Sequence, residues 1–186
     1  MDVTRILEAD HRAVEALFEK IEKADPAKRQ PLVDELATSI TGHMKLEEAT
    51  LYPAMQPVTG AEAVQEGETE HELARKTLKE MVALAPDEPG FGAALDSLKA
   101  GIEHHVKEEE DDVFPKLRKD GESVLQKVAT PFMTKRVELG LPMEAGALSA
   151  AFSKDELSEE ATKAGLEVTS DMTKDDLAEA LADAMA

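Results

Sequence analysis

Apolar residues recur every three to four positions over the first 120 residues, which is the spacing of one face of an α-helix. Turn signals such as Asp25-Pro26, Tyr52-Pro53 and Pro89-Gly90 interrupt this pattern. They delimit four long segments, at 2–24, 28–52, 61–85 and 91–118. Each segment is long enough for a helix of about four to six turns. The pattern predicts an all-α protein whose residues 1–120 form an up-down-up-down four-helix bundle.

The third and fourth segments repeat the first and second. His11 and Phe18 match His71 and Leu78 at an offset of 60. The offset is 62 for the other segments, where the matched pairs are Leu36 and Leu98, Ile40 and Ile102, His43 and His105, Glu47 and Glu109, Tyr52 and Phe114, and Pro53 and Pro115. An internal duplication predicts a pseudo-two-fold bundle. By this symmetry, we expect Tyr52 and Phe114 to plug the two places where the chain leaves a helix at a proline.

The chain after Gly121 has a different organisation. Segment 122–139 is predicted to form a helix interrupted at Pro131, and residues 140–151, rich in Gly, Ala and Pro, are predicted to form a linker. Two further helices are expected in 152–186, because Ser153 and Thr173 are each followed three residues later by an acidic residue suited to a helix cap. The predicted division is a bundle at 1–120, a helix and linker at 121–151, and a small helix–extended–helix module at 152–186.

Composition and charge exclude several classes of function. The chain has no cysteine, so thiolate metal sites, disulfides and thiol catalysis are excluded. Its formal net charge of −19 repels phosphate backbones and anionic lipid, which makes nucleic acid an unexpected partner. No apolar run approaches the ~20 residues that would span a bilayer, so we expect no membrane partner and a cytoplasmic location.

Four histidines lie on the apolar stripes of four different segments, where a polar group is costly unless it is paired or bound. These are His11, His43, His71 and His105. Glu47 and Glu109 each follow one of them by four residues and so lie on the same helix face. Two buried carboxylates need compensating positive charge, which a pair of divalent cations would supply. Imidazole and carboxylate ligands without thiolate suit iron, manganese or zinc. With four protein ligands for each ion, positions would stay open for a small exogenous molecule.

These residues carry a family resemblance. His11, His43-Met-Lys-Leu-Glu47, Glu70-His71 and His105-Val-Lys-Glu-Glu109, with Tyr52-Pro53 and Phe114-Pro115 after the two glutamates, closely resemble the hemerythrin-like HHE cation-binding family over residues 1–118. The resemblance implies a non-haem di-iron centre, oxo- or hydroxo-bridged, that reacts with O2, NO or peroxide. It further implies that Glu47 and Glu109 bridge the irons and that the four histidines are terminal ligands.

The sequence departs from the oxygen-carrying hemerythrins at two positions. Arg75 stands where those proteins have a further histidine, and Glu109 follows His105 by four residues where they have an Asp five residues after the histidine. We therefore expect sensing, scavenging or iron handling rather than reversible oxygen storage. The alternative is a di-iron enzyme that degrades peroxide or oxidises ferrous iron.

A second ligand scheme is open on spacing alone. Glu8 and Glu68 each precede a histidine by three residues, as in ferritin-like bundles, but this scheme leaves His43 and His105 unexplained. His104 is expected to be solvent-exposed because it lies about 100° around the helix from His105. The acidic residues beside the ligands, Glu48, Glu108, Glu110, Asp111 and Asp112, are for the most part expected to form a solvated helix face.

The C-terminal module resembles the small helical domains of the SAP and Rho N-terminal type. The resemblance rests on Ser153-Lys-Asp-Glu-Leu157, Gly165-Leu166 and Met172-Thr-Lys-Asp-Asp-Leu177. Such domains often contact nucleic acid, but residues 151–186 contain three lysines against ten acidic residues. A protein partner is therefore the expectation for this module.

Overall fold

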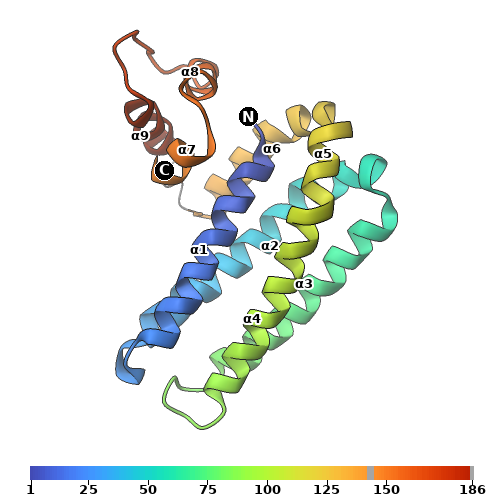
Figure 1. The fold of residues 1–186 in the computed structure, drawn as a ribbon, viewed down its shortest axis with the longest axis vertical. Helices are drawn as coiled ribbons and strands as arrows, with labels where there is room; N and C mark the ends of the chain where they lie inside the picture. Colours follow the sequence, from blue (N-terminus) through green and yellow to red (C-terminus); the bar gives the residue numbers. More distant parts are fainter. Residues whose placement is uncertain (142–144, 185–186) are drawn as a thin grey trace.

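The computed structural model describes residues 1–141 and 145–184. Four long helices lie side by side: α1 (Val3–Lys23), α2 (Gln30–Thr59), α3 (Ala61–Val82) and α4 (Phe91–Glu108) (Figure 1). α1 packs against α2 and α4, and α3 packs against the same two helices. The predicted all-α fold with an up-down-up-down bundle is confirmed. Among the described residues, every helix is too short or too polar to span a lipid bilayer.

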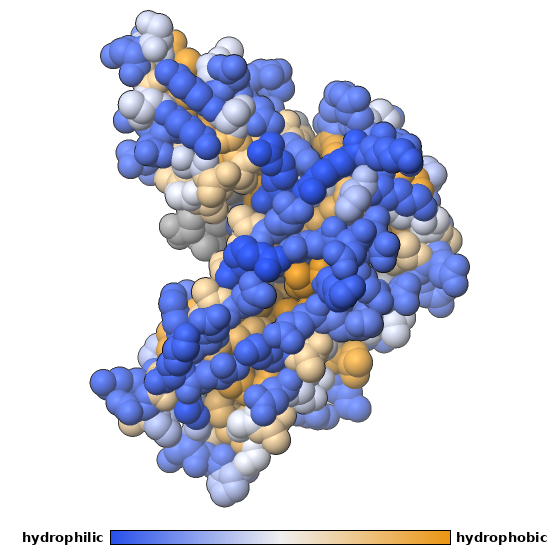
Figure 2. Space-filling view, viewed as in Figure 1, coloured by the Kyte–Doolittle hydropathy of each residue, from blue (hydrophilic) through white to orange (hydrophobic). Residues whose placement is uncertain are grey.

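The bundle interior contains two hydrophobic clusters separated by a polar layer. One cluster lies towards the start of α1 and includes Leu7, Leu46, Leu51 and Phe114. The other lies further along α1 and includes Val14, Phe18, Leu36 and Leu98. Hydrophilic residues cover most of the face shown in Figure 2. The polar layer between the clusters consists of the histidines and glutamates that the sequence singled out.

α2 extends beyond its predicted end at Tyr52. It continues through Pro53 and Pro57 to Thr59, and the backbone N–H of Gly60 donates to Gln56 O at 2.9 Å. A proline inside a helix removes one backbone hydrogen bond and costs about 3 kcal/mol. The additional turns bury Met55 against the hydrophobic cluster and keep Tyr52 inside the bundle. Tertiary packing therefore outweighs the local preference of the chain to end the helix.

The fourth predicted helix, 91–118, changes type along its length. α4 is followed by a π-helical turn at Glu109–Val113 and then by α5 (Phe114–Asp120). A π-helical turn contains one residue more than an α-helical turn, and such turns are frequent at functional sites. The corresponding stretch of α2 is entirely α-helical, so the two halves of the duplication differ here.

The C-terminal part contains more helix than predicted. α6 (Glu122–Glu138) packs against α2 and is continuous through Pro131, where an interruption was expected. The expected linker contains α7 (Ala145–Ala151), while its residues 142–144 lie outside the described part of the chain. α7 packs against α1 and α9 (Lys174–Ala184), and α8 (Lys154–Lys163) packs against α9 (Figure 1). The cap at Ser153 forms as expected, since its hydroxyl accepts from Glu156 N at 3.3 Å.

Replacing Pro53 by alanine tests the cost of the α2 extension. Pro53→Ala restores a backbone donor inside the helix and is expected to raise the free energy of unfolding by about 2 kcal/mol, after the entropy gained by the unfolded chain is subtracted. Urea denaturation measures the change. Pro31→Ala is the matched control, because Pro31 lies in the first turn of α2, where the missing N–H costs little. Equal effects at the two positions would contradict this explanation.

Candidate metal centre

The structure brings all six predicted metal ligands into the polar layer. His11 comes from α1, His43 and Glu47 from α2, His71 from α3, and His105 with Glu109 from α4 and the start of the π-helical turn. All six are buried, with exposed fractions between 0% and 8%. Apolar residues of the two clusters lie on either side of them.

The histidines face each other in two pairs. Nε2 of His11 lies 3.2 Å from Nε2 of His43, and Nε2 of His71 lies 3.2 Å from Nε2 of His105. Each pair combines one residue from each helix of a helical hairpin. In each pair, the ring nitrogens that point at each other are free to bind one common ligand, provided that the Nδ1 atoms carry the hydrogens.

The two glutamates lie between the histidine pairs. Oε2 of Glu47 is 3.3 Å from Nε2 of His43 and 3.4 Å from Nε2 of His71. Oε2 of Glu109 is 3.4 Å from Nε2 of His11 and 3.6 Å from Nε2 of His105. Each carboxylate therefore contacts one histidine of each pair. This position between two sites is the one that a bridging carboxylate requires.

Several of these carboxylate oxygens lack hydrogen-bond partners. Among the described residues, both side-chain oxygens of Glu47 and Oε2 of Glu109 are buried without a hydrogen-bond partner. A buried, unpaired carboxylate costs several kcal/mol, so such atoms call for a cation. Two groups of residues could each hold such a cation, because within each group the ligand atoms lie within 4.8 Å of one another. One group is His11, His43, Glu47 and Glu109, and the other is Glu47, His71 and His105. The residues present fit a pair of metal ions.

A ring of outer carboxylates holds the histidines by their Nδ1 atoms. Nδ1 of His11 lies 2.8 Å from Glu110, that of His71 lies 2.9 Å from Glu48, and that of His105 lies 2.9 Å from Glu70. Such partners fix the orientation and the tautomer of metal-binding histidines. The expectation of a solvated face was therefore wrong for Glu48 and Glu110. These two carboxylates also accept hydrogen bonds from arginines, Glu110 from Arg12 and Glu48 from Arg75.

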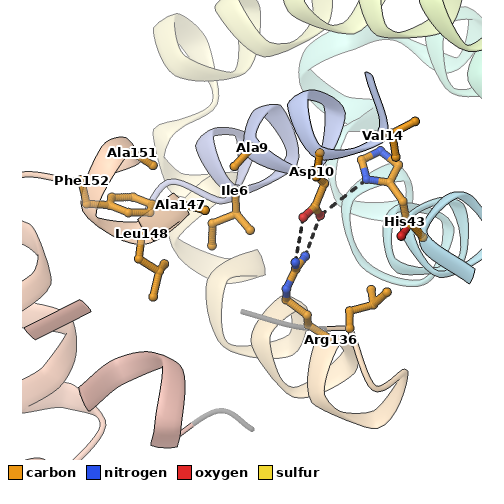
Figure 3. A pocket seen from close by; sticks show the side chains of 13 residues that line it. Ile6, Ala9, Asp10, Val14, His43, Arg136, Ala147, Leu148, Ala151 and Phe152 are labelled. Atoms are coloured by element: carbon orange, nitrogen blue, oxygen red, sulfur yellow. Dashed lines mark hydrogen bonds and ion pairs between the residues drawn. The ribbon is translucent and has the colours of Figure 1, made fainter. Parts of the chain in front are cut away.

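The fourth histidine, His43, faces Asp10 of α1, which is in turn bound by an arginine from outside the bundle. Figure 3 shows Asp10 between His43 and Arg136, and Oδ2 of Asp10 lies 3.6 Å from Nδ1 of His43. Arg136 comes from α6, is 5% exposed, and donates to both oxygens of Asp10 at 2.6 and 2.7 Å. Beside this contact lies a mainly apolar cavity of about 100 Å³, with Phe152 and Leu148 on its far wall (Figure 3). Sequence reasoning missed Asp10 and Arg136, although the charge of Asp10 beside His11 was a signal.

Tyr52 is part of the centre rather than only a plug at the end of the bundle. Its ring stacks on His71 with centroids 5.2 Å apart, and its hydroxyl lies 3.2 Å from Nε2 of His71 and donates to Oε1 of Glu109 at 3.5 Å. Gly67 makes room for it, because a Cβ there would approach the Tyr52 hydroxyl to 2.6 Å. Burial and the charges of Glu47 and Glu109 raise the pKa of Tyr52. The hydroxyl therefore keeps its proton and remains a donor.

The other residues considered for the site lie elsewhere. Glu8 accepts from Arg118 at 2.7 Å, and Glu68 is exposed. Neither belongs to a metal-competent group among the described residues. The geometry therefore does not support the ferritin-like ligand scheme. The side chain of His104 is 65% exposed, in agreement with the expectation.

Protons compensate the buried carboxylates when no metal is bound. Burial opposes the charged form of His11, but contacts with Glu109 and Glu110 outweigh it and raise the pKa of His11 to about 10. Burial also opposes the charged form of His105, yet the charge of Glu109 and the hydrogen bond to Glu70 raise its pKa to about 9. Burial alone would raise the pKa of Glu109, but His105 and His11 lower it to about 2.

Comparison with known proteins agrees with this geometry. The family model of the hemerythrin HHE cation-binding domain matches residues 2–117. The chain belongs to this family. The crystal structure of an HHE cation-binding domain-containing protein from Mycobacterium kansasii is similar, with a TM-score of 0.62 and 25% identity, and the match covers 73% of this chain and 88% of that one.

Two curated relatives share the HHE region. An uncharacterized hemerythrin-like protein of Schizosaccharomyces pombe is 31% identical over 128 residues, which are 63% of this chain and 61% of that protein. A protein of Nostoc sp. named DNA nickase is 28% identical over 119 residues, which are 63% of this chain and 34% of that protein. The chain thus spans less than two thirds of the length of either relative. The family and the buried cluster together identify a hemerythrin-like metal-binding protein.

Metal binding is expected to release protons. Because His11 and His105 titrate near pH 10 and pH 9 in the metal-free protein, both are protonated at neutral pH, and a metal must displace about two protons per chain. Metal affinity should therefore rise steadily between about pH 6 and pH 8 and level off near these pKa values. Titration calorimetry in buffers of different ionisation enthalpy counts the protons. A binding constant independent of pH over this range would contradict the assignment.

Proposed function

We propose that this HHE protein binds O2, NO or peroxide at a pair of iron ions bridged by Glu47 and Glu109. The observation that carries the proposal is the position of the two carboxylates. Each contacts one histidine of each facing pair, and among the described residues both oxygens of Glu47 and Oε2 of Glu109 have no hydrogen-bond partner. Imidazole and carboxylate ligands suit iron, with manganese and zinc as the other candidates. Bound iron would supply the redox chemistry, and an oxo or hydroxo bridge would share its charge between the two ions.

The protein ligands leave room for a small molecule. Two histidines and two shared carboxylates give four protein ligands for each ion, fewer than the six that octahedral iron accepts. The Tyr52 hydroxyl, which already contacts the edge of the site, can donate a hydrogen bond to a small anionic or polarised ligand held there. Arg75, at the position of the further histidine of oxygen carriers, is turned outward to Glu48. We infer sensing, scavenging or iron handling rather than oxygen storage.

DNA is not part of this proposal. The name of the Nostoc relative concerns a protein of which this chain covers 34%. The present chain carries a formal net charge of −19, which opposes binding to phosphate backbones. We propose instead that a small molecule is the main ligand.

Metal content tests the ligand assignment. His43→Ala and Glu47→Gln are expected to lower bound iron from about two ions per chain to one or none, because each removes a ligand in the buried layer. Iron should also raise the melting temperature of the unmutated protein more than that of these variants, because they bind less of it. Glu8→Gln combined with Glu68→Gln is the matched control and should retain full iron. Loss of iron in this control would instead favour the ferritin-like scheme.

The role of Tyr52 is tested by removing only its hydroxyl. Tyr52→Phe keeps the ring that stacks on His71, so iron content should not change. Loss of one hydrogen bond to a charged ligand costs about 1.5–3 kcal/mol, so NO or peroxide should bind about tenfold or more weakly. Optical titration of the iron-loaded protein measures the affinity. Unchanged affinity for O2, NO and peroxide alike would contradict a role for the hydroxyl.

The iron-loaded protein also distinguishes a ligand-binding function from an enzymatic one. Steady consumption of peroxide, or oxygen-dependent oxidation of added ferrous iron over many cycles, would identify the enzyme alternative. A spectral change that saturates with one ligand per centre and then stops would identify a binding protein. If iron-loaded protein shows no response to any of the three ligands, the proposed function is wrong, even where the metal is present.

A further inference from the structure

The four outer carboxylates are not equivalent. Glu48, Glu110 and Asp10 each accept from an arginine, which places a positive charge outside three of the four histidines. Glu70 is the exception, because among the described residues it pairs with no lysine or arginine. Its Oε2 contacts Nδ1 of His105 at 2.9 Å, and its Oε1 lies 3.4 Å from Nε2 of the exposed His104.

A pocket opens beside Glu70, the outer carboxylate that has no arginine partner in the described part of the chain. It has a volume of about 160 Å³, and its lining includes, besides Glu109, four acidic residues, Glu66, Glu70, Glu108 and Asp112. Among the described residues, none of the four forms an ion pair with a lysine or arginine. Tyr52 and Glu109 are part of the same lining. The pocket therefore connects acidic residues near the surface with two residues of the buried centre.

Two observations point to a cation in this pocket. Glu70, His104 and Glu108 each place one ligand atom within 4.8 Å of the others, a mixed imidazole and carboxylate set. Separately, Glu109 is 3% exposed, and its Oε2 has no hydrogen-bond partner among the described residues. Glu70 and Glu108 of this set line the pocket. Glu109, at its inner wall, carries the buried carboxylate that contacts His11 and His105, so the pocket leads to a negatively charged group of the centre.

We propose that Glu70, His104 and Glu108 form a further, weaker site for a divalent cation such as Fe²⁺ or Mn²⁺, and that cations reach the buried centre through this pocket. Carboxylate and imidazole ligands suit both ions. A pocket lined by charges of one sign raises the local concentration of the opposite ion and its rate of association. The arginines beside Glu48, Glu110 and Asp10 repel a cation that approaches the centre past those three carboxylates. The proposal rests on the buried centre binding cations, as proposed above, but not on its reaction with O2, NO or peroxide.

The equilibrium test counts Mn²⁺ ions. Electron paramagnetic resonance of free Mn²⁺ during a titration is expected to reveal one weakly bound ion per chain beyond the tightly bound ones. His104→Ala combined with Glu108→Gln should abolish the weak ion and leave the tight ones. Neither substitution touches a residue assigned to the buried centre. The same number of weakly bound ions in the variant and in the unmutated protein would overturn the site.

The kinetic test measures loading with Co²⁺. Stopped-flow absorption of metal-free protein mixed with Co²⁺ should show loading about tenfold slower for Glu66→Gln combined with Glu108→Gln, with an unchanged final spectrum. Glu35→Gln combined with Asp96→Asn removes the same charge from exposed positions outside the pocket and should load at the original rate. The unmutated protein should also load more slowly as salt is added.

The outcomes separate this proposal from the proposed function. Equal loading rates in the two double variants would overturn the pocket as the route, even if the weak Mn²⁺ ion disappears. Co²⁺ requires no oxygen chemistry, so loading through the pocket can hold in a protein that proves inert to O2, NO and peroxide. If neither Co²⁺ nor iron binds to the buried centre of the unmutated protein, both proposals are wrong.

Discussion

The structure depends on two carboxylates in the middle of a helical bundle. Glu47 and Glu109 lie between the two hydrophobic clusters, where an uncompensated charge costs several kcal/mol. Positive charge at the histidines removes this cost. In the metal-free protein that charge is protons on His11 and His105, and in a loaded protein it would be metal ions. The outer carboxylates serve the same end, because by accepting from Nδ1 they leave the Nε2 atoms to face the centre.

The duplication gives the centre its approximate symmetry, but several residues around it differ between the two halves. Phe114 stacks on His11 as Tyr52 stacks on His71, but only Tyr52 offers a hydroxyl. The π-helical turn begins at Glu109 and has no counterpart in the first half. Glu48 and Glu110 are each held by an arginine, whereas Glu70 faces an exposed histidine and an acidic pocket. A symmetric pair of ligand sets thus has two different surroundings.

The sequence was sufficient to predict the six buried residues. Polar side chains are unusual on the apolar face of a helix, and here they recur at matching positions of the two halves of the repeat. The sequence was not sufficient for the outer carboxylates. Glu48 and Glu110 follow a ligand by one residue, so each lies about 100° around its helix from that ligand. Whether that face meets solvent or a neighbouring helix depends on how the helices pack. Tyr52 was misplaced for a related reason, since the proline after it indicated a helix end that burial of Met55 overrides.

The centre also extends beyond the helices that repeat. The family match ends at residue 117, yet Arg136 of α6 holds Asp10, which holds His43. Burial alone would raise the pKa of Asp10, but the hydrogen bonds from Arg136 and the nearby imidazole of His43 lower it to about 2, so Asp10 stays ionised beside the ligand. Without that arginine, the carboxylate of Asp10 would have only the imidazole of His43, 3.6 Å away, as a charged partner. Arg136 of α6 thus contributes to the charge balance around the centre, although it lies beyond residue 120, where the helical periodicity places the end of the bundle.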